Sequence, residues 1–389
     1  MMRLNKPKLY VFLFLIVAIT TGAWGQLVVE VTEPIISGSI TSMSGFDDSI
    51  FATLADNLEA QILDPAIANE ITQYTNLPTL ASGFANAGAA TAQEGFLRGS
   101  HDIKVFSISL GTSAAVTLPS LSFLNKIDSA DFIEDEGDVY AGIATQPLNV
   151  TASFNLGFLV SGLRGMAKIG YADIPEGLLG EGYAFNALSV GAGLSYQLIE
   201  PKSVPLGVVR WRGLAVASGF FYQRNTTEIG ITDAGDIGIN QVLTTGDVGL
   251  GGTTIIGTAS SAPTIIASVE SSTYTIPLQV STGLRLLYII DLNVGAGVDI
   301  VFGQGKINLK STQDLEFEVD PAYADQIDVT PGSVNISNTT SGDPDFARPH
   351  VMASLGLAMG PVRLEVPFKY YFDEQGNTYV TGVTLGMMF

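Results

Sequence analysis

Charged side chains recur at alternate positions of otherwise apolar segments, where they could form ion pairs or contact a solute. They are Arg164, Lys168, Arg285, Asp299, Arg363, Glu365 and Lys369. A charge that faces lipid at the bilayer midplane costs ~2 to 4 kcal/mol, so these residues suit only faces that contact water or one another. Two interpretations stay open, a structural network of ion pairs and a selectivity element that lines a solute path.

The residue types of the chain give little support for a metal site or a catalytic site. The chain has two histidines and no cysteine, which excludes a zinc site of the multi-histidine kind. A hydrolase would need a serine, a histidine and an acid to converge, and His350 with nearby Ser354 is the candidate on an alternating segment. The acidic run at 128–138 lacks the ligand spacing of an EF-hand loop. We therefore predict no enzymatic activity, no metal and no cofactor.

The amino-terminal residues have the pattern of an export signal. Arg3, Lys6 and Lys8 precede an apolar run at 9–19, which is too short to span a bilayer comfortably. Ala23 and Gly25 then lie two residues apart, as a signal-peptidase site requires. This predicts a cleaved signal peptide at 1–25, with a retained anchor as the alternative.

Composition narrows the class of protein further. The formal net charge of −20 would repel nucleic-acid phosphates, so we expect no nucleic-acid partner. With 46% hydrophobic and only 14% charged residues, the chain is not an acidic disordered protein. After the signal, no apolar run of about 18 residues could form a spanning helix. Dispersed apolar residues in an exported, glycine-rich chain predict a transmembrane β-barrel, whose lumen-facing positions dilute the hydrophobic signal.

Ten segments show the period of two that such strands need, with large apolar residues alternating with small or polar ones. They are 106–118, 148–160, 163–171, 186–198, 208–224, 276–288, 292–302, 351–359, 362–372 and 379–389. In 208–224, turning Arg210 and Arg212 inward also turns Leu214 inward, which predicts a bulge or a late strand start. Long polar stretches at 119–147, 225–271 and 304–347 read as loops, and 225–271 has room for two to four further strands. We predict an all-β antiparallel barrel of about 10–14 strands over residues 103–389.

The last segment carries the features expected of a closing strand. Tyr379, Val383, Leu385, Met387 and Phe389 share one face. The terminal phenylalanine resembles the insertion signal of bacterial outer-membrane proteins, although Met387 stands where an aromatic residue is usual. This resemblance implies the barrel-assembly machinery and outer-membrane lipids as partners.

Residues 26–102 form a separate, partly helical segment. Within 44–99, apolar residues recur at helical spacing after Asp47 and again after Asp64. Nearly all residues in 81–92 are small, which suits close approach of backbones in a confined space. A periplasmic linker and a plug inside the barrel are both compatible with this pattern.

The stretch Thr275-Ile-Pro-Leu-Gln-Val-Ser-Thr-Gly-Leu284 resembles the proline-containing strand of long-chain fatty acid transporter-like outer-membrane barrels. The run of small residues ahead of the barrel is similar to the hatch of that family. The resemblance implies import of a hydrophobic small molecule through a lateral opening.

The sequence thus predicts a barrel in the outer membrane of a Gram-negative-type bacterium that mediates passive passage of a small solute, a hydrophobic one by resemblance. The alternative is a non-transporting barrel whose surface loops serve adhesion or envelope structure.

Overall fold

The computed structural model describes residues 28–32, 35–38, 77–92, 103–119, 141–175, 182–203, 208–231, 241–244, 255–260, 263–319, 327–330, 332–374 and 376–389. Within these residues the chain forms one helix, α4 (Leu77–Thr91), and a set of antiparallel strands. The strands that build the barrel are β3 (Phe106–Leu118), β4 (Gly142–Asn155), β5 (Leu163–Ile174), β6 (Tyr183–Ile199), β8 (Val209–Ile231), β11 (Pro263–Leu286), β12 (Ile290–Val319), β15 (Ala347–Met359), β16 (Val362–Phe372) and β17 (Asn377–Met388).

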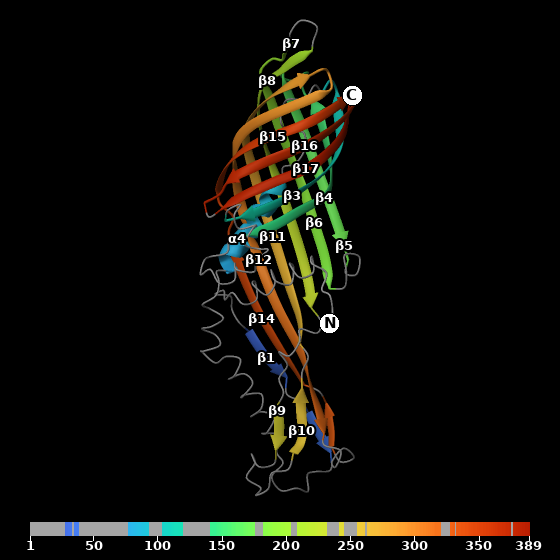
Figure 1. The fold of residues 1–389 in the computed structure, drawn as a ribbon, viewed down its shortest axis with the longest axis vertical. Helices are drawn as coiled ribbons and strands as arrows, with labels where there is room; N and C mark the ends of the chain where they lie inside the picture. The colour runs from blue at the N-terminus through green and yellow to red at the C-terminus, as the bar shows by residue number, and fades with distance from the viewer. Residues whose placement is uncertain are drawn as a thin grey trace.

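Ten strands close into one barrel (Figure 1). Neighbours in sequence pair with each other from β3 to β12 and from β15 to β17. Two further ladders complete the circle, β17 with β3 and β12 with β15. The closed ladder leaves no open edge in the wall, which a barrel in lipid requires, because unpaired backbone groups there cost several kcal/mol each. Ten strands agree with the predicted range.

Side chains alternate along the wall as the sequence predicts. In β3 the small residues are buried inside, while Ile108 and Leu110 are about half exposed outside. The same holds for Leu194, Leu278 and Val294, which are 54%, 53% and 55% exposed. Such a continuous apolar exterior is far larger than a water-soluble monomer usually exposes, so the outer wall is a lipid-facing surface.

Each predicted segment lies on a different barrel strand, and two match the observed bounds, 106–118 and 362–372. One predicted segment extends past its strand, because 156–160 was predicted as strand and forms a turn. There β4 ends at Asn155, and the chain turns back to β5 through the hydrogen bonds Leu159 N to Leu156 O and Leu163 N to Val160 O. Apolar residues in this turn extended the alternating pattern beyond the strand.

The ambiguous face of 208–224 results from a bulge, which was one of the two predicted explanations. Gly213 has a positive φ of 76°, and the registers of β8 with β6 and with β11 both shift near it. Arg212 is therefore buried inside, whereas Leu214, two residues on, turns outward. Glycine is suited to this position because side chains disfavour positive φ.

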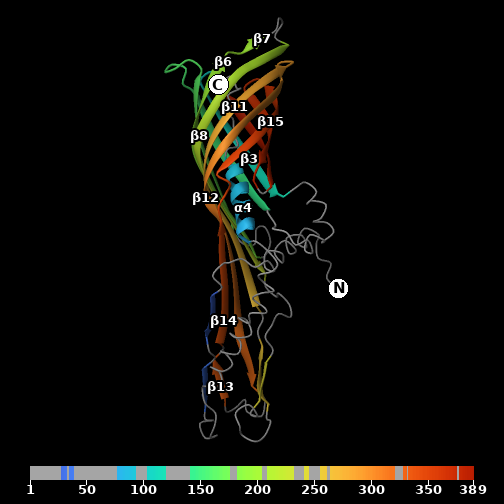
Figure 2. The ribbon, with the colours of Figure 1, turned by 90° about the vertical axis from the view of Figure 1, so that its left-hand side faces the viewer.

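The two ends of the barrel differ. One end, the short-turn rim, holds the turns 156–162, 287–289 and 360–361 and the terminal Phe389. At the other end, the long-loop rim, β8, β11 and β12 continue past the barrel, where β12 pairs with β14 (Gly332–Gly342). We call this projecting sheet the β extension (Figure 2).

The β extension corrects the prediction for two polar stretches. Residues 225–271 and 304–347 were predicted as loops, the first with room for further barrel strands. In the structure they hold prolongations of β8, β11 and β12 together with β14, none of which adds a strand to the barrel wall. The remaining short strands are β1 (Val28–Thr32), β2 (Ile35–Gly38), β7 (Lys202–Ser203), β9 (Gln241–Thr244), β10 (Ile255–Ser260) and β13 (Ile327–Thr330).

The predicted signal peptide at 1–25 and the helix starts at Asp47 and Asp64 lie outside the described residues. Among the described residues, no helix has the length and apolar character to cross a membrane.

Candidate functional site

Helix α4 lies in the lumen of the barrel at the end near the β extension (Figure 2). It contacts strands from around the wall, including β3, β4, β8, β11, β12 and β17. Ala81, Ala85, Ala87 and Ala90 are fully buried. Residues 77–92 thus lie inside the barrel, and a role as a plug stays a prediction.

Backbone-to-backbone contact explains why this run must be small. A Cβ added to Gly142 of β4 would fall on the backbone of Gly83 and Phe84. A Cβ added to Gly305 of β12 would fall on the carbonyl of Ala81. Helix and wall therefore touch without intervening side chains, which fixes where α4 sits along the lumen.

Arg348 of β15 clamps the middle of α4 to the wall. Its Nη1 donates to the carbonyl oxygen of Asn86 at 2.7 Å, while Nε and Nη2 donate to the two carboxylate oxygens of Asp373 at 2.8 and 2.9 Å. Nη2 also donates to Thr378 Oγ1 at 2.9 Å, and the guanidinium lies 4.4 Å from the ring centre of Tyr371. Both charged side chains are 0% exposed, so this is a buried, bidentate and highly directional contact.

Lys168 of β5 contacts the carboxyl-terminal end of the helix. Its Nζ donates to the carbonyl oxygen of Ala92 at 3.0 Å and to Gln146 Oε1 at 2.8 Å. A cation is favoured at this position because the last carbonyls of a helix have no partner within the helix and carry a partial negative charge.

A second charged cluster lies toward the short-turn rim. Asp291 receives three guanidinium groups: Arg212 Nη2 at 2.6 Å, Arg285 Nε at 2.9 Å and Arg363 Nη2 at 2.9 Å. Arg212, Arg363 and Asp291 are at most 2% exposed, whereas Arg285 is 19% exposed. Glu365 lies on the same strand face as Arg363 and acts on it electrostatically.

Asp299 of β12 contacts β15 and β16 between the Arg348 clamp and the Asp291 cluster. Its Oδ2 accepts a hydrogen bond from the Tyr371 hydroxyl at 2.8 Å, and its Oδ1 lies 3.5 Å from His350 Nδ1. Ser354 instead accepts a hydrogen bond from Asn293 Nδ2 at 3.0 Å. His350 and Ser354 thus have separate partners across the wall, and we assign them no joint chemistry.

The predicted lumen charges have well-defined places. Lys168, Asp299, Arg363, Glu365 and Lys369 are at most 3% exposed. Arg164 is half-buried, and its Nη1 donates to Gln197 Oε1 at 3.4 Å. Four charged residues that complete these clusters were not among the predicted site residues: Arg212, Asp291, Arg348 and Asp373. Asp291, Arg348 and Asp373 lie just outside the segments recognised in the sequence, and Arg212 depends on the bulge at Gly213.

The proposed insertion-signal residues lie on the outer face of β17. Val383, Leu385, Met387 and Phe389 are 44–50% exposed, and Tyr379 is half-buried. The Phe389 ring stacks on Phe106 at 4.7 Å, where the last strand meets the first. Recognition by an assembly machinery stays a prediction.

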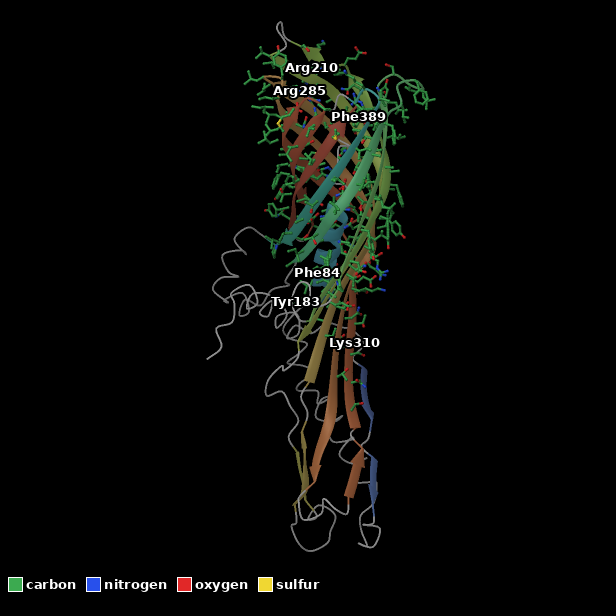
Figure 3. The ribbon with its side chains drawn as sticks, turned by 90° about the vertical axis from the view of Figure 1, so that its right-hand side faces the viewer. Phe84, Tyr183, Arg210, Arg285, Lys310 and Phe389 are labelled. Carbon is green, nitrogen blue, oxygen red and sulfur yellow. The ribbon has the colours of Figure 1, made fainter. Side chains whose placement is uncertain are left out.

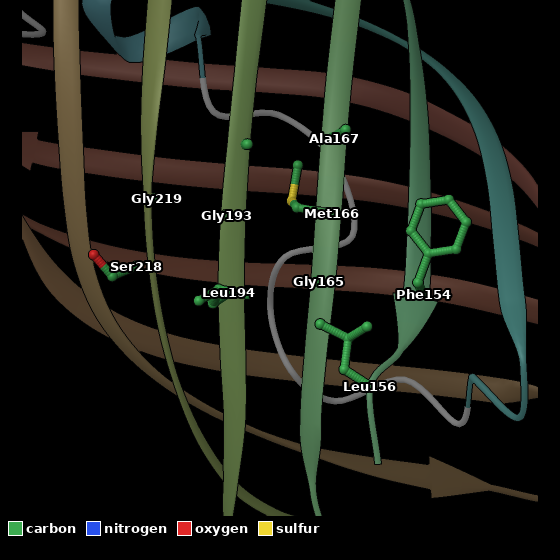
Figure 4. Close-up of a pocket in the computed structure, with 10 residues that line it drawn as sticks. Phe154, Leu156, Gly165, Met166, Ala167, Gly193, Leu194, Ser218 and Gly219 are labelled. Atoms are coloured by element: carbon green, nitrogen blue, oxygen red, sulfur yellow. The ribbon is translucent and has the colours of Figure 1, made fainter. Parts of the chain in front are cut away.

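A groove of ≈ 550 Å³ crosses the outer wall over β4, β5, β6 and β8 (Figure 4). It is lined by the apolar side chains of Phe154, Leu156 and Leu194, together with Gly165 and Gly219. Beside it, the register of β8 with β11 skips Ile276 and Pro277. Proline has no N–H to donate, so the wall is locally weaker next to the groove.

A family model described as Lsa36-like matches residues 26–389. The chain belongs to the Lsa36-like family. No curated protein matches the chain significantly.

Solved structures that match are outer-membrane β-barrels. The translocator domain of the autotransporter NalP from Neisseria meningitidis is 10% identical, with 89% of this chain and 100% of that chain covered and a TM-score of 0.29. The toluene transporter TbuX of Ralstonia pickettii is 9% identical, covering 82% and 99%, with a TM-score of 0.25. The attachment invasion locus protein Ail of Yersinia pestis is 10% identical, covering 72% and 96%, with a TM-score of 0.23. Likenesses at these scores carry no argument about function, and the resemblance to fatty acid transporter-like barrels stays a prediction.

Proposed function

We propose that this member of the Lsa36-like family is an outer-membrane barrel that is closed to solutes in the described state and holds the β extension outside the cell for contact with surface partners. The observation that carries this proposal is that α4 lies in the lumen and contacts strands from around the wall. The hydrogen bond from Arg348 to Asn86 and the backbone contacts at Gly142 and Gly305 hold the helix tightly against the wall. A helix held against the wall inside the barrel argues against free diffusion through it.

The orientation follows from how barrels are built. Short turns face the periplasm and longer connections face outward, so the short-turn rim is assigned to the periplasm and the β extension to the exterior. Figure 3 shows Phe389 and Arg285 near one end of the barrel and Lys310 on the β extension beyond the other. Export by a cleaved signal at 1–25 belongs to this proposal.

The absence of cysteine makes the orientation testable by labelling a single introduced thiol. Lys310→Cys lies exposed on the β extension, and Phe158→Cys replaces a side chain that is 79% exposed in a short turn. With a membrane-impermeant maleimide on intact cells, we expect Lys310→Cys to react and Phe158→Cys to react only after the outer membrane is permeabilised. The reverse pattern, or no labelling of Lys310→Cys, would refute the orientation.

Planar-bilayer recording tests closure. The refolded protein is expected to be silent, and deletion of 77–92 is expected to produce current. Steady conductance in the parent would contradict a closed barrel.

Passage of a small hydrophobic solute is the second candidate, and the groove favours it. An apolar groove in the lipid-facing wall, next to the interrupted pairing at Pro277, offers such a molecule a place to bind. Ala167→Trp would fill the groove, whereas Tyr171→Trp alters the same strand face outside it. If the groove binds the solute, uptake of a fluorescent aromatic probe into vesicles falls in Ala167→Trp and is unchanged in Tyr171→Trp. Equal uptake in both would exclude this candidate.

A further inference from the structure

Helix α4 enters the lumen from the long-loop rim. Near its start, Pro78 lies against Gly342, and Ala81 lies against Gly305, both at the base of the β extension. Near its end, Thr91 accepts a hydrogen bond from Ser113 on β3, and the Ala92 carbonyl reaches Lys168 in the middle of β5. The chain therefore runs inward from the long-loop rim as residue number increases.

The first barrel strand begins at the opposite rim. Val105 N donates to the carbonyl oxygen of the terminal Phe389 at 2.8 Å, and β3 starts at Phe106. Ten residues separate Ala92 from Ile103, and this link can span up to roughly 36 Å. From Lys168 to the rim at Leu163 is five residues of strand, or about 17 Å. The link is long enough to cross the remaining half of the lumen.

Residues upstream of α4 lie still farther out. Strand β1 pairs with β14 along the β extension, from Val28 opposite Ser337 to Thr32 opposite Ser333. Because β14 runs back toward the barrel, β1 leads away from it, and β2 then pairs with β13. Figure 1 shows β1 on the β extension, well away from the barrel. The described residues between 28 and 92 all lie between mid-lumen and the far end of the extension.

We propose that the barrel carries its own amino-terminal segment through the lumen and displays it on the outer surface, with α4 as the part that remains inside. A chain exported into the periplasm presents this segment first on the periplasmic side, while β3 starts there and stays there. Residues 28–38 can reach the β extension only by passing through the lumen as the barrel forms or closes. The small side chains of α4 suit this passage because they let a helix fit against the wall.

This inference rests on the proposed orientation of the barrel, so its test must be separable from that proposal. Two engineered disulfides report the path in cells. Val29→Cys with Ile336→Cys joins directly paired positions of β1 and β14, where Cα separations of about 4.5–5.5 Å allow a disulfide. Gly88→Cys with Ser271→Cys joins α4 to β11, since a Cβ on Gly88 would lie 3.2 Å from the Ser271 Cβ. The control pair is Val29→Cys with Phe158→Cys, at opposite ends of the molecule.

We expect both reporter disulfides to form in cells and the control pair to stay reduced. Formation of the control disulfide, or failure of both reporter pairs in barrels that resist unfolding by SDS at low temperature, would overturn passage of the amino-terminal segment through the lumen. Surface labelling of Lys310→Cys separates this proposal from the proposed orientation. If the β extension is labelled but the reporter disulfides do not form, only passage of the segment through the lumen is refuted. An unlabelled extension refutes the proposed orientation and the display of the segment together.

Discussion

Replacing Arg348 tests whether the clamp on α4 stabilises the closed barrel. Arg348→Met keeps most of the side-chain volume and removes the charge. It leaves the carboxylate of Asp373, which is 0% exposed, with a hydrogen bond that the Thr378 hydroxyl donates to its Oδ2. Breaking a buried ion pair by removing one partner costs about 3–5 kcal/mol, and the retained Thr378 contact places this case near 3 kcal/mol. That corresponds to a change on the order of 100-fold in the ratio of folded to unfolded protein.

A matched control comes from an exposed ion pair on the same barrel. Arg224 and Glu270 lie 3.1 Å apart with side chains 49% and 28% exposed, and such pairs contribute about 0–1 kcal/mol. Arg224→Met should therefore unfold almost as the parent does. The double variant Arg348→Met with Asp373→Leu should recover part of the loss, since neither buried charge is then left without its partner.

Urea unfolding in lipid vesicles measures these differences. Trp211 is the one tryptophan after residue 25, and it lies in the barrel with its Nε1 donating to Thr282 Oγ1 at 2.8 Å. Its fluorescence therefore reports loss of the barrel. If Arg348→Met and Arg224→Met shift the unfolding midpoint equally, the clamp does not stabilise the closed state.

Two further predictions follow from close contacts. Gly305→Ala places a methyl group on the carbonyl of Ala81, so we expect the Gly88→Cys with Ser271→Cys disulfide between α4 and the wall to form less readily. In the control Gly230→Ala, the added Cβ would lie 3.5 Å from its nearest neighbour, so formation of this disulfide should be unchanged. Equal cross-linking in the two variants would show that α4 does not need the close approach at β12. Phe389→Ala removes the stacking contact with Phe106 where the barrel closes, so refolding into vesicles should slow and stability should fall by about 0.5–1.5 kcal/mol. Refolding at the parent rate would argue against a role of this contact in closure.

The sequence by itself determined the barrel wall. In β3 and β16, lipid on one side and a crowded lumen on the other impose a period of two on local residue types, so a single strand shows its own two faces. The bulge in β8 was also predictable, because Arg212 and Leu214 require opposite faces and only an irregular backbone provides them.

Only the tertiary structure decided the β extension and the clusters. Beyond the long-loop rim a strand has no lipid-facing side, so residues 304–319 and 332–342 lose the apolar alternation and look like loops in the sequence. The clamp joins Asn86, Arg348 and Asp373, and Asp291 gathers arginines from three strands; such long-range partners leave no local pattern. Small residues in 81–92 fit a linker as well as a plug, and their backbone contacts with Gly142 and Gly305 are what placed α4 inside the barrel.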